Sequence, residues 1–154
     1  MDPVNFHHVA SYISVLLVPL SLALFLFGIV QSNRNVVRAG LVGCVLAGVL
    51  AGGVFRSGKS AEGSMGPIAQ ASSATIEQHK SIALFGLAGA CASAAAAGLA
   101  LIWMQLRDTP PRWLLPGVAA IALGATLMLL WTAMIGRQIS HSEVMHVASQ
   151  IHDD

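Results

Sequence analysis

The chain contains four long runs of residues in which charged side chains are almost absent. Crossing the roughly 30 Å hydrocarbon core of a bilayer takes about 20 residues of helix, and each run has that length. Inside the hydrocarbon the backbone has no water to bond, so a spanning segment must be a helix or part of a closed barrel. The runs predict an all-α fold, an integral membrane four-helix bundle with up-down-up-down topology. The four predicted spans are Val9–Gln31, Val36–Phe55, Ser81–Leu106 and Leu114–Ile135.

The composition supports a membrane location for the whole chain. Hydrophobic residues make up 55% of the 154 residues and charged residues only 10%, whereas soluble domains are about 25% charged. We therefore expect one transmembrane domain over residues 1–154, in contact with the lipid bilayer, with the fourth helix continuing past the membrane. The net charge of +1 gives no dense basic patch, so nucleic acid is not an expected partner.

The first run is predicted to be a retained span. A cleavable signal peptide has a positively charged start and a short apolar region. The opening MDPVNFHH has no Lys or Arg, and the apolar run that follows it is longer than such a region.

Four spans would divide the tails and loops between the two sides of the membrane. One side, face A, would carry both termini and a loop over Arg56–Lys80, and the other, face B, the connections Ser32–Asn35 and Arg107–Trp113. Positive charges in short loops favour the cytoplasm. Lys and Arg are equally numerous on the two faces, but those of face B are concentrated in very short loops, so face B is assigned to the cytoplasm. The face B arginines are Arg34, Arg38, Arg107 and Arg112.

Small residues recur within the second and third runs. Gly48 and Gly52 have the G-x-x-x-G spacing, and residues 86–100 read GLAGACASAAAAGLA. Small side chains let membrane helices approach closely, so these helices are predicted to pack tightly within the bundle or in an oligomer. Cys44 and Cys91 lie in the same two runs and are predicted to pack as small hydrophobes.

Residues 52–60, GGVFRSGKS, match the G-x-x-x-x-G-K-[ST] pattern of phosphate-binding loops. That motif works between a buried strand and a helix, where backbone N–H groups converge on the phosphates. Here the preceding run is apolar and rich in Gly and Ala, and the following AEGSMGP contains Pro67 and two glycines, which oppose a helix. We expect the match to be coincidental and the chain not to bind nucleotide.

All six histidines fall on face A. With a helical rise of about 1.5 Å per residue, His8, His79 and His141 would lie about 39, 42 and 44 Å from the face B arginines of their own helices. Three imidazoles from three helices would therefore reach similar depth. Thr75 and Gln78 have the spacing of a capping box, which would start the third helix near Ile76.

Helical spacing assigns two of these histidines to stripes on their helices. His8 shares one with Tyr12 and Val15. His146 is five residues beyond His141, so the two would point in different directions. The stripe of His141 comprises Trp131, Met134, Gln138, His141 and Met145.

The histidines allow three interpretations. Imidazole tolerates the headgroup zone without any ligand, because its ring is apolar and its edge polar. Alternatively, facing helices of a bundle hold cofactors and metals in its interior, and neutral imidazole suits haem iron, copper or zinc. Covalent c-type haem is excluded, since the chain has no C-x-x-C-H motif. The candidate ligands are His8, His79 and His141, with His7 and Met145 in addition and Met65 as a soft ligand for copper.

The segment WTAMIGRQISHSE, residues 131–143, resembles a pattern in a family of small bacterial inner-membrane proteins with four predicted helices, the DUF2231 type. The family pattern G-x-x-I-x-H-x-E is similar to Gly136, Ile139, His141 and Glu143. The family also places histidines at the starts of helices one and three, as His8 and His79 do here, although FHHVASYI differs from its usual opening H-P-x-x-V-H-F-P. The resemblance implies a bacterial inner-membrane protein, and the assignment of face B to the cytoplasm makes both termini periplasmic.

These features predict a membrane protein that binds b-type haem near the periplasmic face through two of His8, His79 and His141. Two axial histidines leave no open position on the iron, which favours electron transfer with a quinone or a redox protein over oxygen chemistry. The alternatives are a non-catalytic membrane subunit or scaffold, and a histidine copper or zinc site without haem. No G-x-S-x-G or H-E-x-x-H motif indicates hydrolysis, and whether the protein is an enzyme stays open.

Overall fold

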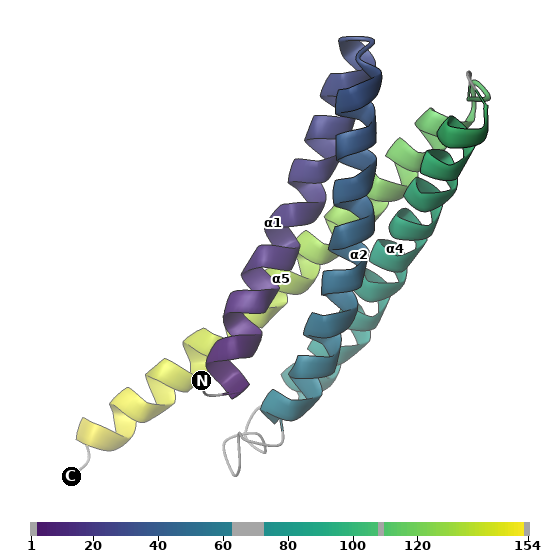
Figure 1. Ribbon diagram of the computed structural model, residues 1–154. Coiled ribbons are helices and arrows are strands. Elements are labelled where there is room, and N and C mark those ends of the chain that lie inside the picture. Colours follow the sequence, from purple (N-terminus) through teal and green to yellow (C-terminus); the bar gives the residue numbers. More distant parts are fainter. Residues whose placement is uncertain (1–2, 63–72, 108–109, 153–154) are drawn as a thin grey trace.

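The protein is a bundle of four helices in the computed structural model (Figure 1), which describes residues 3–62, 73–107 and 110–152. Side chains are described for residues 9–58, 77–78, 81–107 and 110–135. The described part contains no strand, so the predicted all-α fold is confirmed. The helices are α1 (Pro3–Val30), α2 (Arg34–Glu62), α4 (Ser73–Leu106) and α5 (Leu114–His152).

Each helix contains one of the predicted membrane spans. The segments long and apolar enough to cross a membrane are Val9–Val30, Arg34–Gly58, Ser81–Leu106 and Leu114–Ile135. At face A α5 runs on to His152, and α1 passes through Pro19 without a break.

Two helix limits differ from the sequence prediction. Helix α2 reaches Glu62 and α4 begins at Ser73, so both extend into the predicted loop over residues 56–80. Thr75 therefore lies inside α4, and the predicted helix start near Ile76 is wrong. The nucleotide-like segment 52–60 lies wholly within α2. It is thus a stretch of helix, without the loop that the phosphate-binding motif requires.

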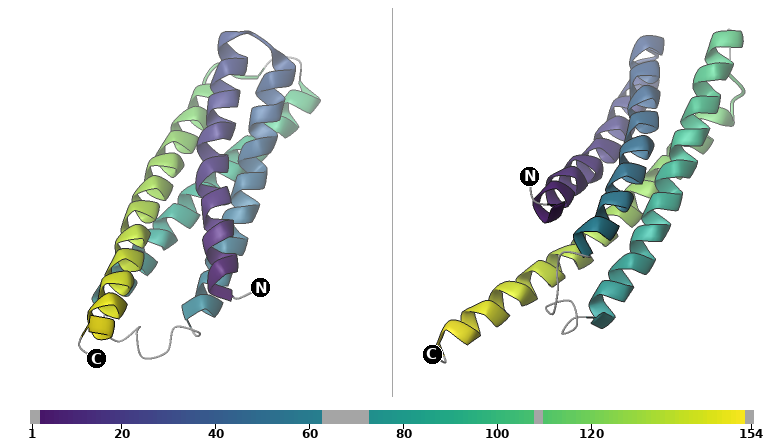
Figure 2. Two further views of the ribbon diagram at one scale, coloured as in Figure 1. Left: turned by 90° about the vertical axis from the view of Figure 1, so that its left-hand side faces the viewer. Right: turned by 60° about the horizontal axis from the view of Figure 1, so that its bottom comes forward.

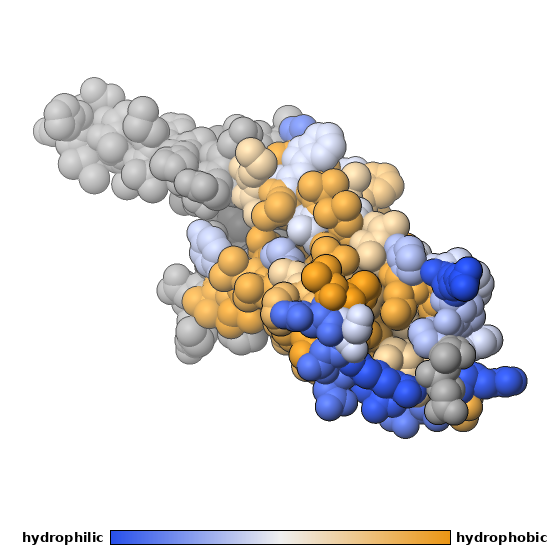
Figure 3. All heavy atoms as spheres, turned by 90° about the horizontal axis from the view of Figure 1, so that it is seen from above, coloured by the Kyte–Doolittle hydropathy of each residue, from blue (hydrophilic) through white to orange (hydrophobic). Residues whose placement is uncertain are grey.

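The outer surface of the spans is apolar. Val49, Leu84, Leu106 and Met134 are each more than half exposed. Soluble monomers rarely expose contiguous apolar surface of this extent, whereas lipid tails accept it. Seen from the end with the short connections, hydrophilic residues gather toward one side of an otherwise apolar end (Figure 3). The chain therefore has the build of a multi-pass membrane protein.

Consecutive helices run antiparallel, as the topology prediction requires (Figures 1 and 2). Helix α1 packs along α2, α2 against α4, and α4 against α5, while a smaller contact between α1 and α5 closes the ring. This order makes α1 and α4 diagonal to each other. The starts of α1 and α4 and the ends of α2 and α5 share face A (Figure 1).

The turn between α1 and α2 is closed by hydrogen bonds at both helix ends. The N–H of Asn33 donates to Gly28 O at 2.9 Å and that of Ser32 to Ile29 O at 3.0 Å, the pattern of a Schellman motif. Ser32 takes the left-handed conformation, φ 52°. Asn33 Oδ1 then accepts the N–H groups of Asn35 and Val36, which caps the start of α2.

Glycines allow the helices to approach closely. A Cβ atom at Gly40 would lie 2.5 Å from the backbone N and Cα of Phe25, and one at Gly48 would lie 2.5 Å from the Cβ of Ala94. Gly52 has open space at the same place. Only the first glycine of the predicted G-x-x-x-G pair therefore packs inside the bundle, where it brings α2 against α4.

The buried core has two parts with side chains of different size. Toward face B it contains large residues such as Phe25, Leu41 and Met104, whereas four of the six members of the face A part are alanines. Cys44 is buried in the face B part, as predicted, but Cys91 is exposed on the outside of α4. The face A part consists of Val18, Ala47, Ala51, Ala90, Ala125 and Leu129.

Candidate functional site

The structure places the three predicted histidines on three helices at one end of the bundle. His8 is in α1, His79 in α4 and His141 in α5. Because α1 and α4 begin at face A and α5 ends there, all three belong to that end (Figure 1). Their side chains, and those of His7 and Met145, lie outside the described set, and Met65 lies outside the described residues altogether. The ligand roles therefore stay predictions.

Counting residues from the face B ends of the helices compares the levels of the histidine positions. Position 8 lies 22 residues from Val30, about 33 Å of helix, and position 79 lies 27 residues from Leu106, about 40 Å. Position 141 lies 27 residues from Leu114, also about 40 Å. Positions 79 and 141 thus lie at similar distances from face B, and position 8 lies somewhat nearer to it.

Helical register in α1 separates His7 from His8. A helix advances about 100° per residue, so position 7 lies within about 20° of the direction of Ser14 and Val18. Both of these side chains are buried against the other helices. Position 8 instead lies within about 20° of Val15 and Pro19, which are only half-buried, and about 40° from Tyr12, whose side chain is 63% exposed. In α1 it is therefore position 7 that continues the buried face.

The same reasoning separates His79 from His141. Position 79 lies within about 20° of the direction of Gly86 and Ala90, which are buried in α4. Position 141 lies within about 20° of Met134, which is 68% exposed. The stripe predicted for His141 therefore runs along the outside of α5 wherever its side chains are described.

A buried hydroxyl lies on the inner face of α1 below the histidine positions. Ser14 is 3% exposed, and its Oγ has no hydrogen-bond partner among the described residues. A buried hydroxyl without a partner costs free energy, about 1–3 kcal/mol. Ser14 is thus a polar group available to a bound molecule in the interior, in line with position 7.

The described side chains contain no group of three or more His, Cys, Asp or Glu residues that could hold a metal ion. None of the six histidines is among those side chains. Positions 7 and 79 nevertheless belong to the diagonal helices α1 and α4 at the same end of the bundle, each in register with buried residues farther along its own helix.

Sequence reasoning ranked His8 above His7, because hydropathy does not mark which face of an apolar helix is buried. The seven-residue spacing from His7 to Ser14 and on to Ser21 was the available signal. Both serines are buried.

Comparison with protein-family models, with curated proteins and with solved structures gave no match. The class that the fold defines is thus a four-helix multi-pass membrane protein with a histidine-bearing end.

Proposed function

We propose that the protein is a membrane electron-transfer protein that binds b-type haem at the face A end of its bundle. The observation that supports the proposal is helical register: positions 7 and 79 continue the lines of buried residues on the diagonal helices α1 and α4, at the same end of the bundle. Diagonal helices can offer two imidazoles to one iron from opposite sides. His7 and His79 would hold the iron, in place of the pair drawn from His8, His79 and His141 that the sequence favoured.

The core below this site is built from small residues, such as Ala51 and Ala90, and it contains the unpartnered hydroxyl of Ser14, which is a polar group that a bound molecule could use. When bound, haem iron would carry one electron at a time between its ferric and ferrous forms. The chain's own part would be to supply both protein ligands of the iron, which would leave no coordination position for a substrate. This favours electron transfer with a quinone or a redox protein.

The proposed setting is a bacterial inner membrane with face B in the cytoplasm. Arg34, Arg38, Arg107 and Arg112 gather at face B in or beside short connections, which supports this orientation. The histidine end and both termini would then be periplasmic. The resemblance of residues 131–143 to small bacterial inner-membrane proteins supports the same setting.

An absorption spectrum of the detergent-purified protein tests the proposal, recorded after supply of haem, first oxidised and then reduced with dithionite. We expect a Soret band that moves on reduction and sharp visible bands. A featureless spectrum with haem supplied would exclude haem binding. Metal analysis of the same sample would then distinguish a histidine copper or zinc site, with Met145 as an additional ligand for copper, from no site at all.

A second candidate function is a non-catalytic membrane subunit or scaffold. It is favoured by small residues on the outer face of α4, where Cys91, Ala92 and Ala95 are exposed and Gly98 has open space beside it. Such residues let a partner helix approach closely. The variant His79→Ala discriminates, because loss of a chromophore from a folded protein supports haem, whereas a scaffold would show no spectral or metal change.

A further inference from the structure

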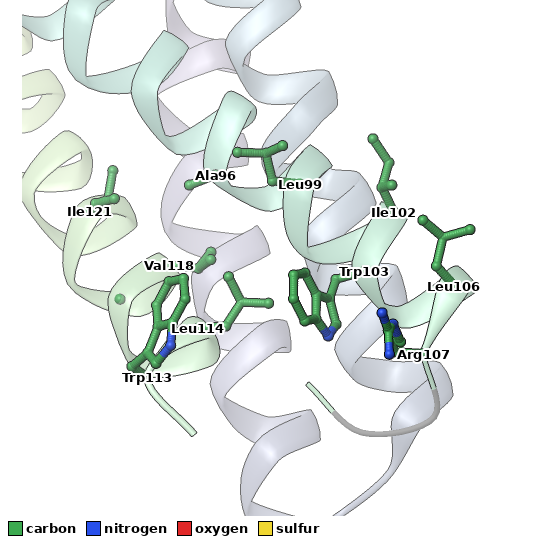
Figure 4. Close-up of a pocket in the computed structure, with 11 residues that line it drawn as sticks. Ala96, Leu99, Ile102, Trp103, Leu106, Arg107, Trp113, Leu114, Val118 and Ile121 are labelled. Carbon is green, nitrogen blue, oxygen red and sulfur yellow. The ribbon is translucent and has the colours of Figure 1, made fainter. Parts of the chain in front are cut away.

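A groove between α4 and α5 opens at face B, at the opposite end from the histidines (Figure 4). Its volume is about 510 Å³. Trp103 of α4 and Trp113, the residue just before α5, stand on its two sides, with Leu114 between them (Figure 4). The rest of the described wall is apolar except for Arg107, and none of the described residues that line it is acidic.

The groove has the length of one leaflet. It runs along α4 from Arg107 to Ala96, which is about 16 Å of helix. Half of a hydrocarbon core roughly 30 Å thick is about 15 Å. The groove therefore covers the depth that a single acyl chain of the face B leaflet occupies.

The polar end of the groove lies at the membrane surface. Arg107 directly follows the last residue of the span that ends at Leu106, and both indole nitrogens lie on the side of their rings nearer the α4–α5 connection (Figure 4). Tryptophan takes this place at membrane interfaces, with the ring among acyl chains and the N–H toward the headgroups. Arg107 adds a positive charge at headgroup level.

Arg107 differs from the other arginines at this end because its side chain lines the groove between α4 and α5. Arg34 and Arg38 direct their guanidinium groups to the backbone oxygen of Met104, and Arg112 lines a separate groove between α1 and α5. Guanidinium recognises phosphate through parallel hydrogen bonds. The groove thus joins an apolar channel to a single cationic side chain.

We propose that this groove binds an anionic phospholipid of the face B leaflet. One acyl chain lies between Trp103 and Trp113, and the phosphate meets Arg107. The charge of the groove selects an anionic headgroup over a zwitterionic one, in which a cationic group offsets the phosphate. The proposal does not depend on the histidine site.

Quenching of tryptophan fluorescence by brominated lipid tests this directly, because two of the three tryptophans line the groove. The third, Trp131, is removed by Trp131→Phe in all samples. The protein is reconstituted in phosphatidylcholine vesicles with a minor fraction of phosphatidylglycerol. In one set the phosphatidylglycerol is brominated, and in the other an equal fraction of the phosphatidylcholine.

We expect brominated phosphatidylglycerol to quench more strongly, with a relative association constant about fivefold higher, the preference that one arginine near the surface provides. Arg107→Gln should abolish the preference while leaving quenching by phosphatidylcholine. Gly117→Leu should fill the groove and reduce quenching by both lipids, because Gly117 lines the groove and a side chain there meets open space.

Gly124→Leu is the matched control. Gly124 is also in α5 and also has open space beside it, but it does not line the groove. Gly124→Leu should be quenched to the same extent as the parent protein. The helical circular dichroism of each leucine variant shows whether that variant is folded. Equal quenching by the two brominated lipids in the parent, or a preference that survives both Arg107→Gln and Gly117→Leu, would overturn the proposal in favour of nonspecific annular lipid.

Discussion

The guanidinium of Arg34 donates a hydrogen bond to the backbone oxygen of Met104, with Nη2 2.6 Å from that oxygen. Arg38 Nη2 lies 3.1 Å from the same atom. The last carbonyl groups of a helix have no partner within it and carry partial negative charge. Two arginines from the start of α2 therefore cap the end of α4. The positive charges of face B hold helices together as well as favouring one orientation.

Replacing Arg34 should loosen this end of the bundle. In Arg34→Gln we expect the free energy of unfolding to fall by about 1 kcal/mol, because a charge-assisted hydrogen bond between α2 and α4 is lost. The loss is limited because Arg38 still donates to the same oxygen. Thermal unfolding in detergent, followed by circular dichroism, measures it. Arg112→Gln is the control, since Arg112 has no part in this cap. A double variant of Arg34 and Arg38 should lose more unfolding free energy than the sum of the two single variants, because neither arginine then caps the oxygen. Strictly additive losses would contradict a shared cap.

The glycines of α2 should differ sharply in their tolerance of a methyl group. Gly40→Ala places a Cβ 2.5 Å from the backbone of Phe25, where no flexible side chain can give way. We expect the free energy of unfolding to fall by about 1–3 kcal/mol, because α1 and α2 are forced apart. Gly52→Ala meets open space and should be neutral or gain up to about 1 kcal/mol in helix propensity. Equal melting temperatures for the two variants would contradict the observed packing.

Ser32 holds a backbone conformation that suits glycine better. Its φ of 52° lies in the left-handed region, which costs an L-residue about 1 kcal/mol or more. Ser32→Gly should therefore raise the unfolding temperature modestly, and Ser32→Ala, which keeps the same cost, should not. The comparison is made in one detergent by the same melting experiment. A gain in both variants would point to the loss of the serine hydroxyl as its cause.

The sequence was sufficient for the helices and their spans because the signal for a span is length without charge, which needs no knowledge of neighbours. The sequence was insufficient to predict which face of each helix points into the bundle. Lipid and protein core are both apolar, so hydropathy does not separate Leu41, which is fully buried, from Leu46, which is more than half exposed. Which glycine packs, Gly48 or Gly52, depends on where α4 crosses α2. The bond from Arg34 to Met104 joins residues 70 apart, and no local pattern marks it.

The candidate site shows the same limit. Counting residues from face B placed three histidines at similar depth, and the described helices do bring their positions to one end (Figure 1). The choice between His7 and His8 needed the burial of Ser14 and the exposure of Tyr12. These depend on how α1 packs in the bundle.

Neighbouring histidines in α1 provide the sharpest test of the proposed haem site. If His7 and His79 hold the iron, His7→Ala and His79→Ala should each lose the low-spin visible bands, because one axial position opens. His8→Ala and His141→Ala should keep them, since position 8 lies off the buried face of α1 and position 141 follows the exposed Met134. Added imidazole should restore the bands in His7→Ala by filling the vacant position, which a folding defect would not allow. Loss of the bands in His8→Ala with retention in His7→Ala would reverse the register assigned to α1.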